Sequence, residues 1–396
     1  MRKIANWSSL RILRDWKIRS LLLLFLLFFG SFSLLYRQQN LTFPEFEMKE
    51  EYQDEREIYR LIPQSHFEGE LGQEVQHTLG SNSVALGVNA YILKQREGNN
   101  VEGIVELPDY IENGQQIVEN NMFLHEAKDF ESHDLLLREY LPALEEVEQQ
   151  ERFYDALLEN DLEVEWNYFS AAQILKVEVE LLAGFLLFLL IAIFASDHFT
   201  KDQVNHWSVT HGIPVPWKTQ WRTRSLLLFS LFWFVILGAI AISFVIGNLV
   251  DTSGSLMYPA ELYFENGIHY IPLWQYVLLV IIMAMLLSYL LMLLTTGLSW
   301  FTRNFYLTIL IVSGLFLLSQ LWEFIPAFSS WQPSLYLDLM GVIDGTTATN
   351  TGIQGIVWWK APIIYLGMIA VLEGVFSSIF SKIPTITAGL QRRVNA

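Results

Sequence analysis

Hydrophobic residues gather along this chain in uninterrupted blocks and do not alternate with polar ones. The blocks cover residues 21–36, 177–195, 226–250, 273–297, 306–321 and 361–380. A helix needs about 20 apolar residues to cross a bilayer, so most of these blocks are long enough and the block 306–321 is short. Charged residues or interfacial Trp and Tyr bound every block, as is typical of membrane spans. The pattern therefore predicts about six transmembrane helices.

Basic residues near the ends of the blocks predict their orientation. The segment before the first block is rich in Arg and Lys, and the loop between the second and third blocks carries Lys201, Lys218, Arg222 and Arg224. The segment 251–272 contains no Lys or Arg. Because basic residues favour cytoplasmic loops, we expect both termini in the cytosol and the region between the first two blocks outside.

These expectations divide the chain into four parts. Residues 1–19 would form a cytoplasmic amphipathic entry helix, although a plain basic flank explains them nearly as well. Residues 20–36 would form the first transmembrane helix, which no small-residue cleavage site follows. Residues 37–173 would form a large, mostly helical extracellular domain, and residues 174–396 a five-helix transmembrane bundle. The sequence thus predicts an all-α, multi-pass integral membrane protein of a bacterial cell membrane.

Composition narrows the class of protein further. Hydrophobic residues make up 52% of the chain, and a soluble domain of this composition would expose large apolar patches. The net charge of −17 is concentrated between the first two blocks, and this acidity argues against nucleic-acid binding. The chain has no cysteine, so disulfides and thiolate chemistry are excluded.

Local signals predict structure inside the acidic region. Residues 42–45 have the spacing of a capping box, and the stretches 84–94 and 135–162 favour helices. Asn99-Asn100 and Asn113-Gly114 favour turns.

Few residues suggest a catalytic site, a metal site or a translocation path. The chain has no Gly-x-x-x-x-Gly-Lys-Ser/Thr loop, so it does not hydrolyse ATP by that route. His125, Asp129 and His133 are spaced by four and would share a helix face that suits zinc, but a solvated acidic helix explains them better. Glu373 stands out as the charged residue inside the blocks, where a carboxylate faces either the translocation path or the inner interface.

Two segments between the blocks are amphipathic or apolar. In the stretch 198–224, Val204, Trp207 and His211 share one helical face, which fits an interfacial anchor or a docking helix for a cytoplasmic partner. The stretch 324–359 is too apolar for a loop in water, so we expect short re-entrant helices on the outer side.

The order of these parts resembles the ABC-2 family of exporter permeases. The motifs that carry the resemblance are Asp197 with Phe199, then Asp202, the short helix to His211, Pro214 and Arg222, the run 254–259 (Gly-Ser-Leu-Met-Tyr-Pro) and the run 333–338. The chain departs from the family at Asp202, where glutamate is usual, and at Asn205-His206, which replace Gly-Thr. These departures put the detailed docking contacts in doubt.

The resemblance implies a division of labour. A separate ATPase dimer, which holds ATP and Mg, would dock under residues 197–224, and this chain would carry no cofactor. Two permease chains, identical or related, would pair in the bilayer and open a route for an unidentified substrate. Two other readings stay open, namely a membrane sensor whose acidic external domain binds a cationic ligand, and a membrane-embedded enzyme.

Overall fold

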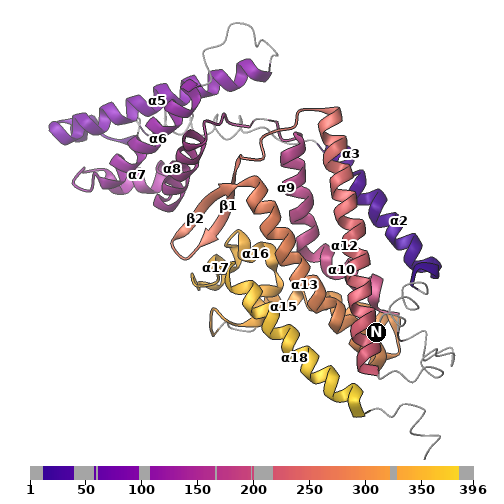
Figure 1. Ribbon diagram of the computed structural model, residues 1–396. Helices are drawn as coiled ribbons and strands as arrows, with labels where there is room; N and C mark the ends of the chain where they lie inside the picture. Colours follow the sequence, from indigo (N-terminus) through magenta and orange to yellow (C-terminus); the bar gives the residue numbers. More distant parts are fainter. Residues whose placement is uncertain are drawn as a thin grey trace, which may run out of the picture.

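Helices dominate the architecture of the protein (Figure 1). The computed structural model describes residues 12–39, 58, 61–97, 108–165, 167–197, 199, 217–321 and 328–382. Four helices among these are long and apolar enough to cross a membrane: Ala171–Ala195, Trp217–Val250, Leu273–Thr302 and Lys360–Ser381. The prediction of a mostly helical chain with several helices suited to a membrane is therefore confirmed, whereas the six spans and their topology stay predictions.

Three of the predicted spans are interrupted, and the second of them breaks at Gly184. The first consists of α2 (Trp16–Gly30) and α3 (Phe32–Tyr36), separated at Ser31, whose hydroxyl donates to the Leu27 carbonyl at 2.6 Å. The fifth consists of α14 (Phe305–Gly314) and α15 (Leu317–Gln320). Together α14 and α15 are shorter than the four long helices, as the short block in the sequence indicates.

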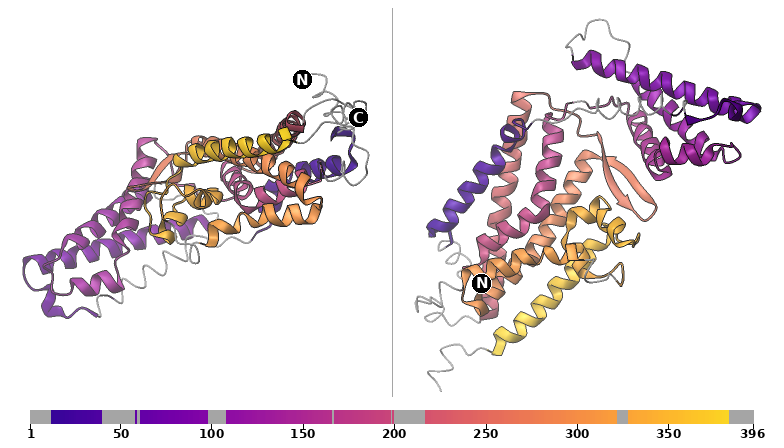
Figure 2. Two further views of the ribbon diagram at one scale, coloured as in Figure 1. Left: turned by 90° about the horizontal axis from the view of Figure 1, so that it is seen from below. Right: turned by 180° about the vertical axis from the view of Figure 1, so that it is seen from behind.

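Helices α5 to α8 form a separate domain at one end of the molecule, named the external domain after its predicted location. They are α5 (Glu70–Glu97), α6 (Pro108–Glu126), α7 (His133–Glu139) and α8 (Leu144–Glu159), preceded by η1 (Gln64–Phe67). Their core contains Val75, Leu79, Leu124 and Leu136. Figure 2 places this domain beyond the end of the bundle opposite to the end where α18 (Lys360–Lys382) finishes. The helices expected at 84–94 and 135–162 are present, with a break between α7 and α8.

The turn expected at Asn113-Gly114 is wrong, because both residues lie inside α6. A Cβ atom on Gly114 would lie 2.3 Å from the ring of Tyr154 on α8. Glycine at this position therefore permits close helix packing and not a turn. The capping box at residues 42–45 and the turn at Asn99-Asn100 lie outside the described residues.

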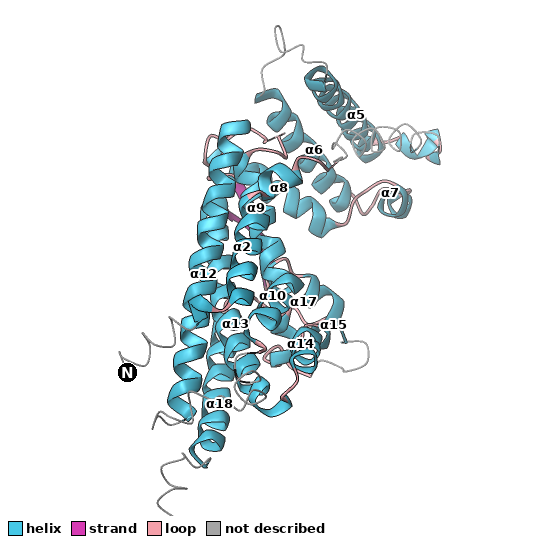
Figure 3. Ribbon diagram, turned by 90° about the vertical axis from the view of Figure 1, so that its right-hand side faces the viewer, coloured by secondary structure: helices cyan, strands magenta, loops and turns pink. Residues whose placement is uncertain are grey.

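The bundle is built around two long helices. Helix α13 (Leu273–Thr302) packs against α12 (Trp217–Val250), α10 (Leu187–Ala195) and α18, and α12 also packs against α2 and α9 (Ala171–Leu181). Figure 3 shows α12 running along the whole height of the bundle beside α2 and α9. Trp233 of α12 donates to the Ser288 hydroxyl of α13 at 2.7 Å, so a buried polar contact supplements the apolar packing.

A β-hairpin corrects the all-α expectation. Strands β1 (Pro259–Phe264) and β2 (Gly267–Pro272) pair antiparallel, with Ala260 opposite Ile271. Gly267 has φ +108°, a conformation that glycine adopts without strain at the end of the turn. The hairpin lies between α8 and the bundle.

Short helices cover the same end of the bundle, as expected for residues 324–359. They are η5 (Pro333–Leu337), α16 (Leu339–Ile343) and α17 (Thr346–Thr351). The Tyr365 hydroxyl of α18 donates to the Tyr336 carbonyl at 2.6 Å and fastens this cover to the bundle. Its depth in a bilayer stays a prediction.

Candidate functional site

The predicted docking stretch is only partly described. Asp197, Phe199 and Arg222 are placed, whereas Asp202, Val204, Trp207 and His211 lie outside the described residues. The docking helix itself therefore stays a prediction, and the structure bears on how its two ends are held.

The start of this stretch is anchored to the bundle. Asp197 forms an ion pair with Lys17 at the start of α2, at 3.2 Å. The Phe199 ring is buried, with the Arg224 guanidinium 4.6 Å from its centroid. The two residues thus join the end of α10 to α2 and α12.

The far end of the stretch is anchored as well. Arg222 of α12 pairs with Glu373 of α18, and the Trp221 indole donates to the Leu293 carbonyl of α13 at 3.1 Å. Rings pack around these contacts: Phe199, Trp217, Trp221, Trp300, Phe376 and Phe380. Glu373 therefore has a cationic partner, as a carboxylate in an apolar bundle needs, and its role in a translocation path stays a prediction.

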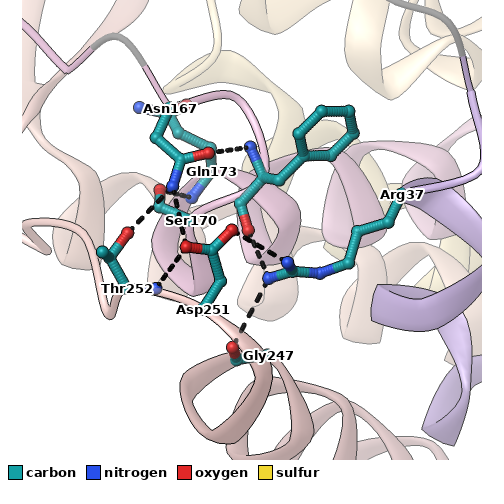
Figure 4. Close-up of polar contacts among 8 residues, drawn as sticks. Arg37, Asn167, Ser170, Gln173, Gly247, Asp251 and Thr252 are labelled. Carbon is teal, nitrogen blue, oxygen red and sulfur yellow. Dashed lines mark hydrogen bonds and ion pairs between the residues drawn. The ribbon is translucent and has the colours of Figure 1, made fainter. Parts of the chain in front are cut away.

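A second polar cluster lies at the opposite end of α12 (Figure 4). It is named the outer junction because the predicted orientation places this end outside. Arg37, just after α3, pairs with Asp251 at 2.8 Å and donates to the Phe169 carbonyl at 2.6 Å. The Asn167 amide donates to Asp251 at 3.2 Å and to the Thr252 hydroxyl at 3.0 Å. The residues that leave the first span and those that enter α9 thus meet at the end of α12.

The charge states at the outer junction follow from these contacts. Burial acts to raise the pKa of Asp251, but hydrogen bonds from the Thr252 amide, Arg37 and Asn167 outweigh it and lower this pKa. Burial raises the pKa of the nearby Glu165, and a hydrogen bond from the Ser255 amide opposes this only in part. The contributions of Asp251 and Glu165 to the free energy of unfolding therefore change with pH in opposite directions.

Helix α12 connects the two anchored ends. Its 34 residues run without a break from Trp217, next to the docking stretch, to Val250, next to Asp251. At 1.5 Å per residue the helix is about 51 Å long. A single continuous helix therefore links the docking stretch to the outer junction.

An acidic cavity of about 870 Å³ lies between the external domain and the cover of the bundle. Its charged lining residues come from α8, the hairpin and the segment around α17: Glu145, Glu146, Glu148, Arg152, Glu265 and Asp344. Arg152 is already paired with Glu148 at 3.0 Å and donates to the Ile268 carbonyl at 2.8 Å. The cavity thus presents excess negative charge.

Two carboxylates inside the bundle were missed by the sequence reading, which singled out Glu373 alone. Glu178 and Glu180 both lie on α9, in the candidate span Ala171–Ala195. Glu180 accepts a hydrogen bond from the Tyr276 hydroxyl of α13 at 2.7 Å, whereas Glu178 is fully buried. The letters E-V-E at 178–180 were a sufficient signal, which the long apolar run after them obscured.

The spacing of His125, Asp129 and His133 does not produce a shared helix face. Helix α6 ends at Glu126, one residue after His125, and α7 begins at His133. His125 contacts the Pro142 carbonyl at 2.9 Å, and His133 contacts the His125 carbonyl at 3.3 Å. Asp129 lies in the turn between the two helices, so the single continuous helix that both the zinc alternative and the preferred acidic-helix interpretation assumed is wrong.

No protein-family model, curated protein or solved structure matches this chain.

Proposed function

We propose that this chain is the membrane subunit of an ATP-driven exporter, a permease that couples a separate ATPase to a path through the bilayer. The observation that carries the proposal is the continuity of α12 between two fastened ends, the docking stretch inside and the outer junction outside. A helix of this kind converts a push at one end into movement at the other.

The contacts suggest how the coupling works. An ATPase dimer, which holds ATP and Mg, binds the stretch 198–224. It displaces this stretch when its nucleotide binds. The Arg222–Glu373 pair and the Trp221 contact make α12, α13 and α18 move together. A second permease chain completes the path, and the outer junction rearranges as the path opens.

Sidedness tests the proposal directly. The chain has no cysteine, so a single Ser208→Cys variant reports on the docking stretch without background. We expect a membrane-impermeant maleimide to leave Ser208→Cys unlabelled in intact cells and to label it after permeabilisation. The matched control, Asn350→Cys in exposed α17, is labelled from outside. Labelling of Ser208→Cys in intact cells contradicts the proposal.

The alternative of a membrane sensor is favoured by the acidic cavity, which suits a cationic ligand. The two functions differ in their need for an ATPase. In the exporter, Asp202→Ala or Trp207→Ala reduces the amount of ATPase that co-purifies and reduces transport. A protein that purifies without an ATPase and keeps its cellular phenotype in both variants is the sensor.

A further inference from the structure

Glu178 is a buried carboxyl group that forms no ion pair with the described residues. Its exposed fraction is 0%, and neither of its carboxyl oxygens has a hydrogen-bond partner among the described residues. It lies seven residues after the start of α9, which is about 10 Å into the bundle. A charged carboxylate in such a place costs several kcal/mol unless a cation compensates it.

One hydroxyl group from a neighbouring helix accompanies Glu178. Ser243 of α12 lies near the carboxyl group without a hydrogen bond to it that meets the usual geometry. The Ser243 hydroxyl accepts a hydrogen bond from the Ser33 amide of α3 at 3.2 Å. Helices α3 and α12 therefore meet next to the buried carboxyl group in one dry location, the Glu178 site.

Charged and titratable groups on the elements around α9 are already engaged elsewhere. Arg37 after α3 binds Asp251 after α12. On α13, Tyr276 donates to Glu180, which also lies 4.0 Å from Lys176. On α3, Tyr36 stacks on Phe32, the charged residues of α12 lie at its inner end, and the segment η2 (Leu182–Leu186) has none.

We propose that Glu178, next to Ser243, is a binding site for a single proton, occupied in the closed packing of α9 against α12. The proton is held on a carboxyl oxygen and leaves to water that enters when the two helices separate, which leaves a hydrated carboxylate. Gly184 breaks the helix between α9 and α10 with φ −82° and ψ −151°, so α9 and α10 are separate helical segments. The site goes beyond the proposed function and does not require the ATPase.

Chemical labelling of the full chain in native membranes tests the occupancy. Dicyclohexylcarbodiimide reacts with protonated carboxyl groups in apolar surroundings, and mass spectrometry locates the modified residue. We expect modification of Glu178 that declines as the pH rises from about 5 to about 9. Absence of modification across this range overturns the proposal. Protection by Na⁺ at constant pH overturns the proton assignment in favour of a metal cation.

A stability measurement gives an independent readout. Glu178→Gln keeps the shape of the protonated side chain and cannot lose a proton. A carboxyl that is protonated in the folded state stabilises below its unfolded titration range and ceases to do so as the pH rises. We therefore expect the melting temperature of the purified wild type to fall with rising pH more steeply than that of Glu178→Gln. The control Glu119→Gln, on exposed α6 surface, keeps the wild-type slope. Equal slopes in wild type and Glu178→Gln contradict the proposal.

Discussion

Asp251 is the residue on which both connections of the external domain converge. It binds Arg37, where the chain leaves the first span, and Asn167, where the chain returns toward α9. These are charge-assisted hydrogen bonds in a partly exposed place, so each contributes modestly to stability. Their main effect is to hold three segments together, because Asp251 after α12 contacts both Arg37 after α3 and Asn167 before α9.

We expect Asp251→Asn to lower the stability of the purified protein at neutral pH by about 1 kcal/mol or less. The pKa of Asp251 is lowered in the folded protein, so its contribution is present above its usual pKa near 3.8 and is lost as the pH falls through the lower, folded value. Thermal unfolding curves of wild type and Asp251→Asn should therefore converge in acid.

The control for this experiment is Asp155→Asn on exposed α8 surface, which should leave the unfolding temperature unchanged. A difference between Asp251→Asn and wild type that persists unchanged at pH values well below the usual pKa contradicts the assignment.

Helix α12 is the element that decides whether the two ends of the bundle communicate. It crosses the bundle without proline and packs on α2, α9 and α13. Gly238, near its middle, would have open space around a Cβ atom, with no atom within 4 Å. A side chain can therefore be added at Gly238 without a clash with the neighbouring helices.

Gly238→Pro should interrupt the helix, because proline removes a backbone hydrogen bond and clashes with the preceding turn, at a cost of about 3 kcal/mol. Gly238→Ala is the matched control and should be tolerated. In a Thr252→Cys background, we expect ATP to change the maleimide labelling rate in the control and not in the proline variant, while both retain the ATPase subunit. The same ATP response in both variants contradicts the role of α12.

On the scale of the whole molecule, the external domain is an insertion whose two ends meet. Arg37 contacts the Phe169 carbonyl directly at 2.6 Å, so the chain leaves and re-enters the bundle at one place. The domain has its own core and touches the bundle mainly through α8 and the hairpin. The bundle therefore depends on the domain for few of its contacts.

Replacement of residues 40–164 by a short Gly-Ser linker should leave a folded bundle. The expected result is a monodisperse elution profile in detergent and the same external labelling of Asn350→Cys as in the full chain. As a comparison, the same deletion combined with Arg37→Ala should aggregate more, because it removes the contacts of Arg37 with Asp251 and with the Phe169 carbonyl at the outer junction. Aggregation of the simple deletion to the same extent contradicts this view of the domain.

The sequence could predict the membrane class because long apolar runs are a local property of the chain. Four of the predicted spans form helices long and apolar enough to cross a membrane, and the helices at 84–94 and 135–162 follow from local periodicity. The hairpin at 259–272 was missed since its short strands are stabilised by packing between α8 and the bundle. The turn at Asn113-Gly114 was wrong because the close approach of Tyr154 is a long-range contact.

The sequence by itself determined that this chain has apolar helices long enough to cross a membrane and carries a large acidic domain, because hydrophobicity and charge act through composition and order along the chain. Only the tertiary structure decided which polar residues meet: Arg222 with Glu373, Arg37 with Asp251, and Tyr276 with Glu180. Such pairings depend on the relative rotation and height of helices far apart in sequence, and periodicity along one helix does not fix either quantity.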